Sequence, residues 1–313
     1  MRAAVESGNG GSKHFIVVGI PAFNEEKTIA KVVLKAQKHA DKVVVCDDGS
    51  TDLTADIARR MDAEVIRHDR NLGYGASIRS LFTRAKELDA DVLVTLDADG
   101  QHDPDEIPTV VKPIIEGAAD VVIGSRFTDN GSTSDMRWYR QAGIKLITRL
   151  TNNASKYHVK DAQSGFRAYG RRSLENLDVS ENGMGASVEL LLDANKHGLK
   201  IQEVPTTCNY SRGNETSTQN PVRHGFSVVT SIFRLLVEDK PLILLGLPGL
   251  VFTIVGVLFG IWLLQSYAVA HRIITNIALA SIGFVFIGFF CMSTAITLYA
   301  ISRLAERVRR NHE

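Results

Sequence analysis

Residues 91–104 read Asp91-Val92-Leu93-Val94-Thr95-Leu96-Asp97-Ala98-Asp99-Gly100-Gln101-His102-Asp103-Pro104. A short apolar run bounded by polar turn residues predicts a buried parallel strand over 91–96, with the acidic residues at its carboxyl end. In open α/β sheets, ligands bind at that edge. Asp97, Asp99 and Gln101 offer only oxygen ligands, which suit Mg²⁺ or Mn²⁺ shared with substrate phosphates. An Asp-rich turn selected only for its backbone geometry is the alternative.

The composition separates a charged, mixed segment from an apolar one. Residues 13–240 combine charge with apolar periodicity, whereas 242–301 hold two long apolar runs. The net charge of +1 over 313 residues gives no electrostatic argument for binding nucleic acid. Three cysteines far apart in the sequence predict buried or membrane thiols without a disulfide framework: Cys46, Cys208 and Cys291. Residues 1–12 are rich in Gly and Ser and lack an apolar signal core, which predicts a disordered tail.

Strand-like and helix-like runs alternate through the first half of the chain. The expected strands are 15–20, 43–46, 64–66, 91–96 and 119–123. One expected helix follows Asn24, and the others span 53–61, 76–88 and 105–117. Asn24 and Asp52 are expected to cap the first two helices. This alternation predicts an α/β, Rossmann-like, doubly wound and mostly parallel sheet with right-handed crossovers.

The loops at the carboxyl ends of such strands converge on one crevice. They carry Asp48, Asp97, Asp99, Gln101 and Arg126. No Gly-x-Gly-x-x-Gly follows the first strand, which argues against a dinucleotide site. Gly73-Tyr74-Gly75 is better explained as a turn at the start of a helix than as a phosphate loop.

Two C-terminal runs are long enough to cross a membrane. Residues 242–264 and 277–301 contain no charged side chain, and each exceeds the roughly 20 residues that span a hydrocarbon core. Arginines follow the second run at 303, 307, 309 and 310, and Lys240 precedes the first, whereas the connecting loop holds only His271 and Arg272. The positive-inside rule therefore predicts an integral membrane protein whose catalytic domain and C-terminus are cytosolic.

Two further segments have the pattern of amphipathic helices. Residues 135–150 set basic side chains among aromatic and aliphatic ones, and residues 222–237 place apolar side chains at helical spacing. Such helices either lie in the lipid headgroup layer or pack on the sheet.

Five motifs occur in order along the chain. They are Pro21-Ala22-Phe23-Asn24-Glu25, Asp47-Asp48-Gly49-Ser50-Thr51-Asp52, Asp97-Ala98-Asp99-Gly100-Gln101, Gly124-Ser125-Arg126 and Asp161-Ala162-Gln163-Ser164-Gly165-Phe166-Arg167. In these motifs the chain resembles family 2 glycosyltransferases of the GT-A fold, specifically the polyprenyl-phosphate (dolichol-phosphate) hexose synthases. The resemblance covers roughly residues 14–240.

The resemblance implies a role for each matched residue. The implied nucleotide-sugar-binding residues are Pro21, Phe23, Glu25, Cys46, Asp48, Asp97, Ala98, Gln101 and Arg212. The implied ligands of Mg²⁺ or Mn²⁺ are Asp97, Asp99 and Gln101, and the implied catalytic residues are Asp99, Arg126 and Arg140. The expected organisation is a tail (1–12), a GT-A domain (13–220), a juxtamembrane helix (221–240), two membrane helices (241–302) and a basic tail (303–313).

The chemistry that the resemblance implies is transfer of a hexose, with inversion, from a UDP- or GDP-sugar to polyprenyl phosphate. A phosphate monoester is already ionised near neutral pH, so it needs cations such as Arg126 and Arg140 and no general base. Glu189 lies where transferases with hydroxyl acceptors carry a catalytic carboxylate, and we interpret it as positional or as a solvated helix acid. His102 is expected to support the acidic cluster or to be exposed, and not to be a ligand.

Several alternatives stay open. The sugar and the base stay open, because the contacts that select them depend on loop shape. Glu215-Thr216-Ser217-Thr218 stands where mannose synthases place Gly, Ser and Lys after the loop arginine, so mannose is not singled out. An enzyme that extends a lipid-linked glycan, or a processive synthase, is the nearest rival. The Gln-x-x-Arg-Trp motif of processive synthases is not matched, because Arg137-Trp138 precedes residues 161–167 and Ser134 stands in place of Gln. A membrane-anchored scaffold that binds nucleotide sugar without turnover is the rival from another class.

Overall fold

The computed structural model describes residues 14–128, helical positions within 141–152, residues 158–208, 242–271 and 274–310. The chain divides into two compact units, Met1–Ile232 and Phe233–Glu313.

A seven-stranded sheet forms the centre of the first unit. Its strands are β1 Ile16–Ala22, β2 Lys42–Asp47, β3 Glu64–Arg67, β4 Val92–Thr95, β5 Val121–Ser125, β6 Arg167–Gly170 and β7 Ile201–Pro205. The order across the sheet is β3-β2-β1-β4-β6-β5-β7. The β1, β2, β3 and β4 neighbours pair in parallel, as do β5 and β7, whereas β6 runs antiparallel to both β4 and β5. The predicted doubly wound, mostly parallel α/β sheet is therefore confirmed, and its last two strands were not predicted.

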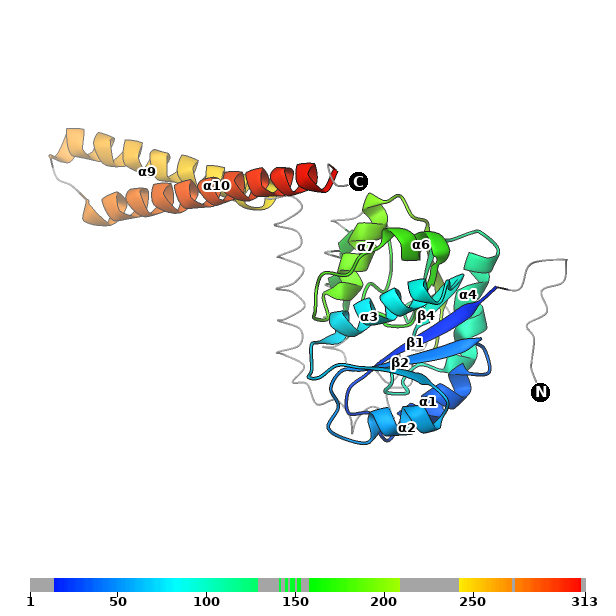
Figure 1. Cartoon of the computed structure of the whole chain (residues 1–313). Coiled ribbons are helices and arrows are strands. Elements are labelled where there is room, and N and C mark those ends of the chain that lie inside the picture. The colour runs from blue at the N-terminus through cyan, green and yellow to red at the C-terminus, as the bar shows by residue number, and fades with distance from the viewer. Residues whose placement is uncertain are drawn as a thin grey trace. The chain divides into compact units, whose positions relative to one another are not determined.

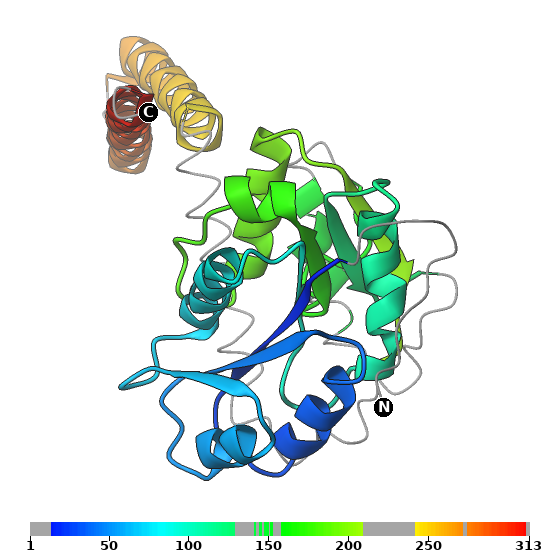
Figure 2. The ribbon, with the colours of Figure 1, turned by 45° about the vertical axis from the view of Figure 1, so that its right-hand side comes forward.

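Helices cover both faces of this sheet (Figures 1 and 2). They are α1 Ile29–Ala36, α2 Thr54–Arg60, α3 Tyr74–Glu87, α4 Ile107–Ile115 after a 3-10 turn at Pro104–Glu106, α6 Arg171–Asn176 and α7 Ala186–Lys196. The apolar sides of α1, α2 and α4 pack against one face of the strands. Those of α3, α6 and α7 pack against the other. The alternating side chains of buried strands supply both cores.

The strand order reverses between β1 and β4, because β2 and β3 lie on one side of β1 and β4 lies on the other. In open α/β sheets such a switch point opens a crevice at the carboxyl ends of the strands. Glu25 follows β1 and Asp97 follows β4, so both emerge beside this switch point.

The expected helix cap at Asn24 is wrong. Helix α1 begins only at Ile29. Asn24 has a left-handed backbone with φ of 57°, and its side-chain oxygen accepts from the Thr51 N–H at 2.9 Å. It therefore ties the loop after β1 to the loop after β2. Asp52 does act at a helix start, because its carboxylate accepts from the Thr54 N–H at 3.0 Å.

The second unit contains an apolar helical hairpin. Helix α9 spans Leu247–Ala270 after a π-helical turn at Leu242–Gly246, and α10 spans Thr275–Arg310. Where the helices pack, a Cβ on Gly256 would lie 2.7 Å from Val285, and the Ser281 hydroxyl donates to the Gly256 carbonyl at 2.8 Å. Small residues of this kind allow close approach of helices in lipid.

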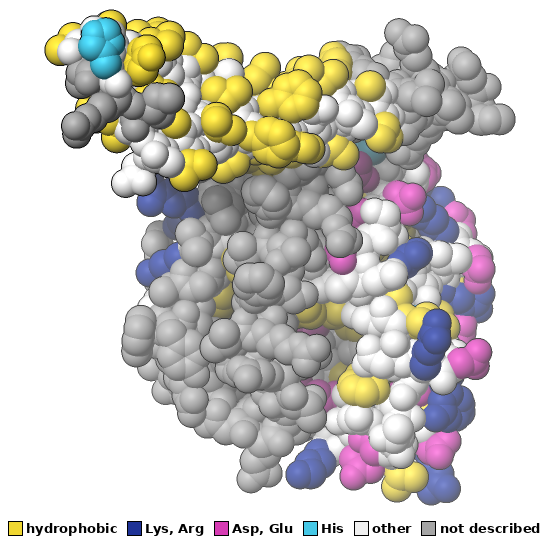
Figure 3. All heavy atoms as spheres, turned by 90° about the vertical axis from the view of Figure 1, so that its left-hand side faces the viewer, with side chains coloured by type: hydrophobic (Ala, Val, Ile, Leu, Met, Phe, Trp, Pro, Cys, Tyr) yellow, Lys and Arg dark blue, Asp and Glu magenta, His cyan; other side chains and the backbone are white. Residues whose placement is uncertain are grey.

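The surface of the hairpin is apolar. Among the described residues, all but four of the exposed large hydrophobic side chains lie in 242–301. Figure 3 shows such side chains over the visible face of α9 and α10. Two stretches, Leu242–Val269 and Thr275–Ile301, are long and apolar enough to cross a membrane. A contiguous apolar surface of this extent is not typical of water-exposed helices.

Candidate active site

Three carboxylates gather where β1 and β4 end. Burial raises the pKa of Asp97 to about 7, and the neighbouring charges of Asp99 and Glu25 add to this rise. Burial likewise raises the pKa of Glu25 to about 7, with Asp99 again contributing. Part of each rise comes from a neighbouring carboxylate, because like charges disfavour ionisation of one another. A cation among them would relieve the repulsion.

The loop that carries Asp99 and Gln101 is a tight turn. Gly100 has a φ of 69°, and the Gln101 N–H donates to the Asp99 carboxylate at 2.9 Å. The side-chain oxygen of Gln101 faces the thiol of Cys208, with Sγ 3.8 Å away. The turn thus holds Asp99 and Gln101 beside the end of β4, and Cys208 orients the amide of Gln101.

The reversed strand β6 brings a second segment to the same edge. The Thr95 hydroxyl at the end of β4 donates to the Gly165 carbonyl at 2.8 Å. A Cβ on Gly165 would lie 2.6 Å from Oδ1 of Asp97 and closer still to Oδ2. Only glycine therefore leaves room for the Asp97 carboxylate at this position.

Arg167 holds the segment around Gly165 in place. Its guanidinium is 1% exposed and donates to the backbone carbonyls of Ser164 at 2.9 Å, Ala162 at 2.7 Å and Ser187 at 2.7 Å. Its charge also acts to lower the pKa of Asp97. These three hydrogen bonds thus fix the Arg167 charge near Asp97.

Arg126 forms a buried, two-pronged ion pair with Asp161. The Arg126 Nε lies 2.6 Å from one Asp161 oxygen, and Nη2 lies 2.7 Å from the other. Asp161 is fully buried, and Arg126 is 6% exposed. The Arg126 charge acts to lower the pKa of Asp97, which puts Arg126 at the same edge of the sheet. The ion pair fixes the direction of the guanidinium, since its planar fork matches a carboxylate.

His102 is buried beside this pair. Burial, followed by the Arg126 charge, lowers its pKa to about 4, so the ring is neutral near pH 7. The ring lies against Phe166, with centroids 5.4 Å apart. The expected supporting position agrees with this packing, and the alternative of an exposed ring is wrong.

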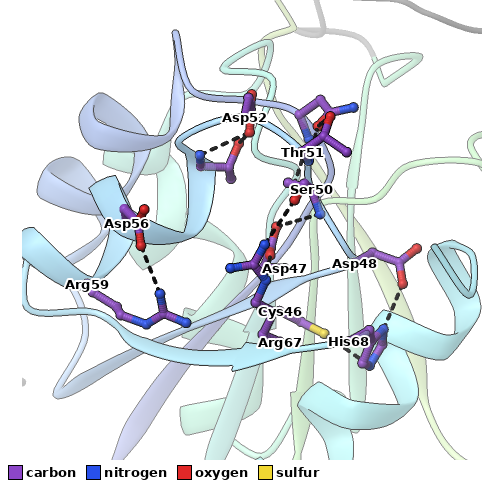
Figure 4. Close-up of polar contacts among 12 residues, drawn as sticks. Cys46, Asp47, Asp48, Ser50, Thr51, Asp52, Asp56, Arg59, Arg67 and His68 are labelled. Atoms are coloured by element: carbon purple, nitrogen blue, oxygen red, sulfur yellow. Dashed lines mark hydrogen bonds and ion pairs between the residues drawn. The ribbon is translucent and has the colours of Figure 1, made fainter. Parts of the chain in front are cut away.

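A separate group of polar contacts surrounds Asp48 at the end of β2 (Figure 4). Asp48 accepts from His68 Nδ1 at 2.7 Å and from the N–H groups of Leu72 and Gly73 at 2.9 and 2.8 Å. Cys46, which precedes it, has no exposed side-chain surface and faces His68 Nε2 at 3.6 Å. The Cys46 side chain therefore faces the imidazole that donates to Asp48.

The other predicted binding residues differ in exposure. Phe23 is 38% exposed beside Glu25, Pro21 is half-buried, and Ala98 is 3% exposed. Arg140 and Arg212 lie outside the described residues, as do residues 222–237 and most of 135–150.

Glu189 holds a neighbouring loop. Its carboxylate accepts from the backbone N–H groups of Ser180 and Glu181 and from the Ser180 hydroxyl. The next residue of that loop, Asn182, accepts from the Gly75 N–H at 2.8 Å where α3 begins. This agrees with a positional role, and a freely solvated helix acid is excluded.

The donor set suits a hard divalent cation that also binds its substrate. Among the described residues, no three His, Cys, Asp or Glu side chains converge closely enough to hold a metal by themselves. Mg²⁺ is typically bound by one or two carboxylates together with waters and substrate phosphates. Asp97, Asp99 and the Gln101 amide match this arrangement, and a bound cation would offset the burial and the neighbouring charges that raise the pKa of Asp97.

Comparisons with known proteins identify relatives of this chain. The pattern of the family described as Glycosyl transferase family 2 matches residues 17–178, which contain all five motifs. UDP-N-acetylglucosamine–dolichyl-phosphate N-acetylglucosaminyltransferase of Methanococcus voltae is 34% identical over 69% of this chain and 93% of its own length. Dolichyl-phosphate hexose transferase of Haloferax volcanii is 33% identical over 72% of this chain and 95% of its own length.

A solved structure shares the fold. Glucosyl-3-phosphoglycerate synthase from Mycobacterium tuberculosis, in complex with Mn²⁺, UDP and glucosyl-3-phosphoglycerate, superposes with a TM-score of 0.56 at 23% identity. The superposition covers 71% of this chain and 79% of that one. This likeness confirms the expected GT-A fold.

The roles of Asp161, Gly165, Arg167 and His68 were missed by sequence reasoning. The first three belong to a motif that was recognised, but their contacts depend on the direction of β6. His68 has no motif of its own, and its only signal is its place just before Asn71-Leu72-Gly73.

Proposed function

The chain belongs to glycosyl transferase family 2 and is a glycosyltransferase, and we propose that it transfers a hexose from a nucleoside-diphosphate sugar to polyprenyl phosphate. The observation that carries the proposal is the acidic cluster of Asp97, Asp99 and Glu25 at the switch point of the sheet, with Arg126 at the same edge. This arrangement supports a site for a cation and diphosphate beside a fixed guanidinium.

The donor is proposed to bind along the loops that follow β1, β2 and β4. Phe23, Glu25 and Asp48 would contact the nucleoside, and Asp97, Asp99 and Gln101 would hold Mg²⁺ or Mn²⁺ under the diphosphate. A bound divalent cation offsets the negative charge on the leaving nucleoside diphosphate. The carboxylates of Asp97 and Asp99 must be ionised for this, and the fixed Arg126 and Arg167 charges favour the ionised form of Asp97.

The acceptor is proposed to be a phosphate monoester, which attacks the sugar carbon opposite the leaving group and so inverts its configuration to give a β-linked product. Such a nucleophile needs no base near neutral pH. The contacts of Glu189 support this choice, because its carboxylate is engaged by Ser180 and Glu181. Arg126 and Arg140 are proposed to bind the acceptor phosphate, and Arg212 the donor.

The lipid part of the acceptor is supported by two findings of different kinds. The relatives named above carry dolichyl phosphate in their names. The apolar hairpin has two stretches of membrane-spanning length. We therefore propose a GT-A domain at 13–220, a juxtamembrane helix at 221–240 and a membrane hairpin at 241–302, with the catalytic domain and the basic tail at 303–313 in the cytosol.

The test is transfer of label into lipid. The purified full-length protein, in detergent with Mn²⁺ and polyprenyl phosphate, is incubated with radiolabelled UDP-glucose, UDP-N-acetylglucosamine or GDP-mannose. Label in the organic phase with one donor is the expected result, and mild acid should release it because a sugar phosphate bond is labile.

Each other outcome has a distinct meaning. Long water-soluble labelled chains would identify a processive synthase, and label transferred only to a lipid that already carries sugar would identify an enzyme that extends a glycan. No transfer from any donor, despite binding of UDP or GDP, would identify a scaffold. Any of these would refute the proposed acceptor.

A further inference from the structure

The carboxylate of Asp48 is almost enclosed by donors from its own chain. Oδ1 accepts from His68 Nδ1 at 2.7 Å and from the Leu72 N–H at 2.9 Å, and Oδ2 accepts from the Gly73 N–H at 2.8 Å. The residue is 4% exposed. A carboxylate has about four acceptor positions, so one position, on Oδ2, remains for an N–H or O–H group of a ligand.

The protonation of His68 follows from its partners. The Asp48 oxygen can only accept, so His68 Nδ1 carries the proton. In the neutral ring, Nε2 is then an acceptor, and the Ser80 hydroxyl lies 2.9 Å from it. The Cys46 thiol also faces Nε2 at 3.6 Å, and burial raises the pKa of this thiol to about 11, which keeps it protonated. The imidazole therefore connects Ser80 on α3 to Asp48, which directly follows β2. Figure 4 shows the contact between His68 and Asp48.

The backbone around His68 leaves the ring little freedom. The His68 N–H donates to the Asp47 carbonyl at 2.9 Å, which continues the pairing of β3 with β2. Gly49 has a φ of 74°, and a Cβ there would lie 2.5 to 2.8 Å from the backbone of Arg70 and Asn71. The turn after β2 and the segment after β3 are thus packed too tightly for either to shift alone.

An Asp–His–Ser arrangement also occurs in hydrolases with a serine nucleophile, but this one does not fit that role. Ser80 lies inside α3, where backbone N–H groups donate to carbonyls one turn earlier. They cannot form the oxyanion hole that acyl transfer requires. Asp48 moreover accepts two backbone N–H groups in addition to the imidazole, which makes it the centre of the arrangement.

We propose that His68, held by Ser80, is a positioning residue that fixes the Asp48 carboxylate and thereby sets the affinity for the donor nucleotide. The proposal rests on the proposed function, because it takes Asp48 to contact the nucleoside. Without the imidazole, Oδ1 loses one of its two donors and the carboxylate can rotate, so its last acceptor position on Oδ2 is no longer directed at the ligand.

The test compares His68→Leu, His68→Asn and Ser80→Ala with the wild type, and uses His197→Asn as the matched control. His197 lies at the end of α7 and contacts Asp193 of the same helix. The measurements are the KM for the sugar nucleotide, the KM for polyprenyl phosphate, kcat, and the Kd of UDP and GDP by calorimetry with Mn²⁺. Thermal unfolding verifies that each variant is folded.

His68→Leu should raise the donor KM and the Kd of the nucleoside diphosphate about tenfold or more, because it removes a hydrogen bond to a charged group. The KM for polyprenyl phosphate and kcat should stay within about twofold. His68→Asn should recover most of the affinity, because its amide N–H can replace Nδ1–H. Ser80→Ala should lie between the two, and it serves as the readout if His68→Leu does not fold.

Equal losses in His68→Leu and His68→Asn, or parallel loss of kcat and of lipid affinity, would show a merely structural role and overturn the proposal. So would a nucleotide Kd unchanged in His68→Leu or, if that variant does not fold, in Ser80→Ala. If the wild type transfers no sugar to lipid, the proposed function fails, and the calorimetric comparison still decides the role of His68.

Discussion

Replacing Gly165 with alanine tests the acidic cluster without touching a ligand. The added Cβ would lie 2.6 Å from Oδ1 of Asp97 and 2.8 Å from its Cγ, whereas ordinary contacts begin at 3.4 Å. The φ of Gly165 lies outside the left-handed region, so the contact with Asp97 is the main obstacle to alanine. The carboxylate must therefore move by close to 1 Å, and overpacking of this kind costs about 1–3 kcal/mol.

A displacement of about 1 Å at a catalytic centre can reduce turnover on the order of a hundredfold. Gly165→Ala should accordingly lower kcat/KM by roughly 10- to 100-fold and raise the Mn²⁺ concentration needed for half-maximal activity. The assay is transfer of labelled sugar to polyprenyl phosphate over a Mn²⁺ series, with thermal unfolding measured in parallel. Gly183→Ala is the matched control, because the nearest atom to its Cβ is 3.4 Å away, at the Glu181 carboxylate.

A folded Gly165→Ala variant with wild-type activity and an unchanged Mn²⁺ requirement would refute the reasoning. It would mean that the position of the Asp97 carboxylate does not matter for transfer. Loss of folding in Gly165→Ala would move the test to Asp97→Asn, which keeps the shape of the side chain and removes the charge. Full activity in that variant would remove Asp97 from the metal site.

Three further perturbations address other parts of the site. Asp99→Ala should abolish transfer while the thermal unfolding temperature stays near that of the wild type, and full activity would remove the metal assignment. Because burial raises the pKa of Asp97 and Glu25 to about 7, these groups stabilise the metal-free fold below their ordinary values near 4 and lose that contribution as the pH rises through 7. The increase in Tm on adding Mn²⁺ and UDP should therefore be larger at pH 8 than at pH 6, and an equal increase at both would contradict the shifts. Asp161→Ala leaves the Arg126 charge buried without its carboxylate and should lower the free energy of unfolding by about 3–5 kcal/mol in urea titrations. A loss below about 1 kcal/mol would show that solvent reaches the guanidinium.

The sequence alone determined the parts of the fold that depend on local patterns. Mostly apolar runs of three to six residues predicted the first five strands, because a buried strand carries its signal in its own residues. The uncharged runs in 242–301 predicted the helical hairpin for the same reason. Asp97, Asp99 and Asp48 come just after predicted strands. The sequence therefore predicted that they lie at one edge of the sheet, since parallel strands have their carboxyl ends on the same side.

Local patterns also have a limit, which the short strand β6 illustrates. It reads Arg167-Ala168-Tyr169-Gly170, which has no apolar alternation, so its existence could not be predicted from its own residues. Its antiparallel position between β4 and β5 is set by pairing with residues 44 to 78 positions away in the chain. Similarly, the misassigned Asn24 cap was plausible by residue type, but Asn24 instead pairs with Thr51 across two loops.

Tertiary structure alone therefore decided which side chains surround the acidic cluster. The reversal of β6 sets Gly165 against Asp97, and it allows Asp161 to bind Arg126. The pairing of β3 with β2 sets His68 against Asp48. Each contact joins residues at least 20 positions apart, and such contacts arise from strand direction and packing, which no short stretch of sequence encodes.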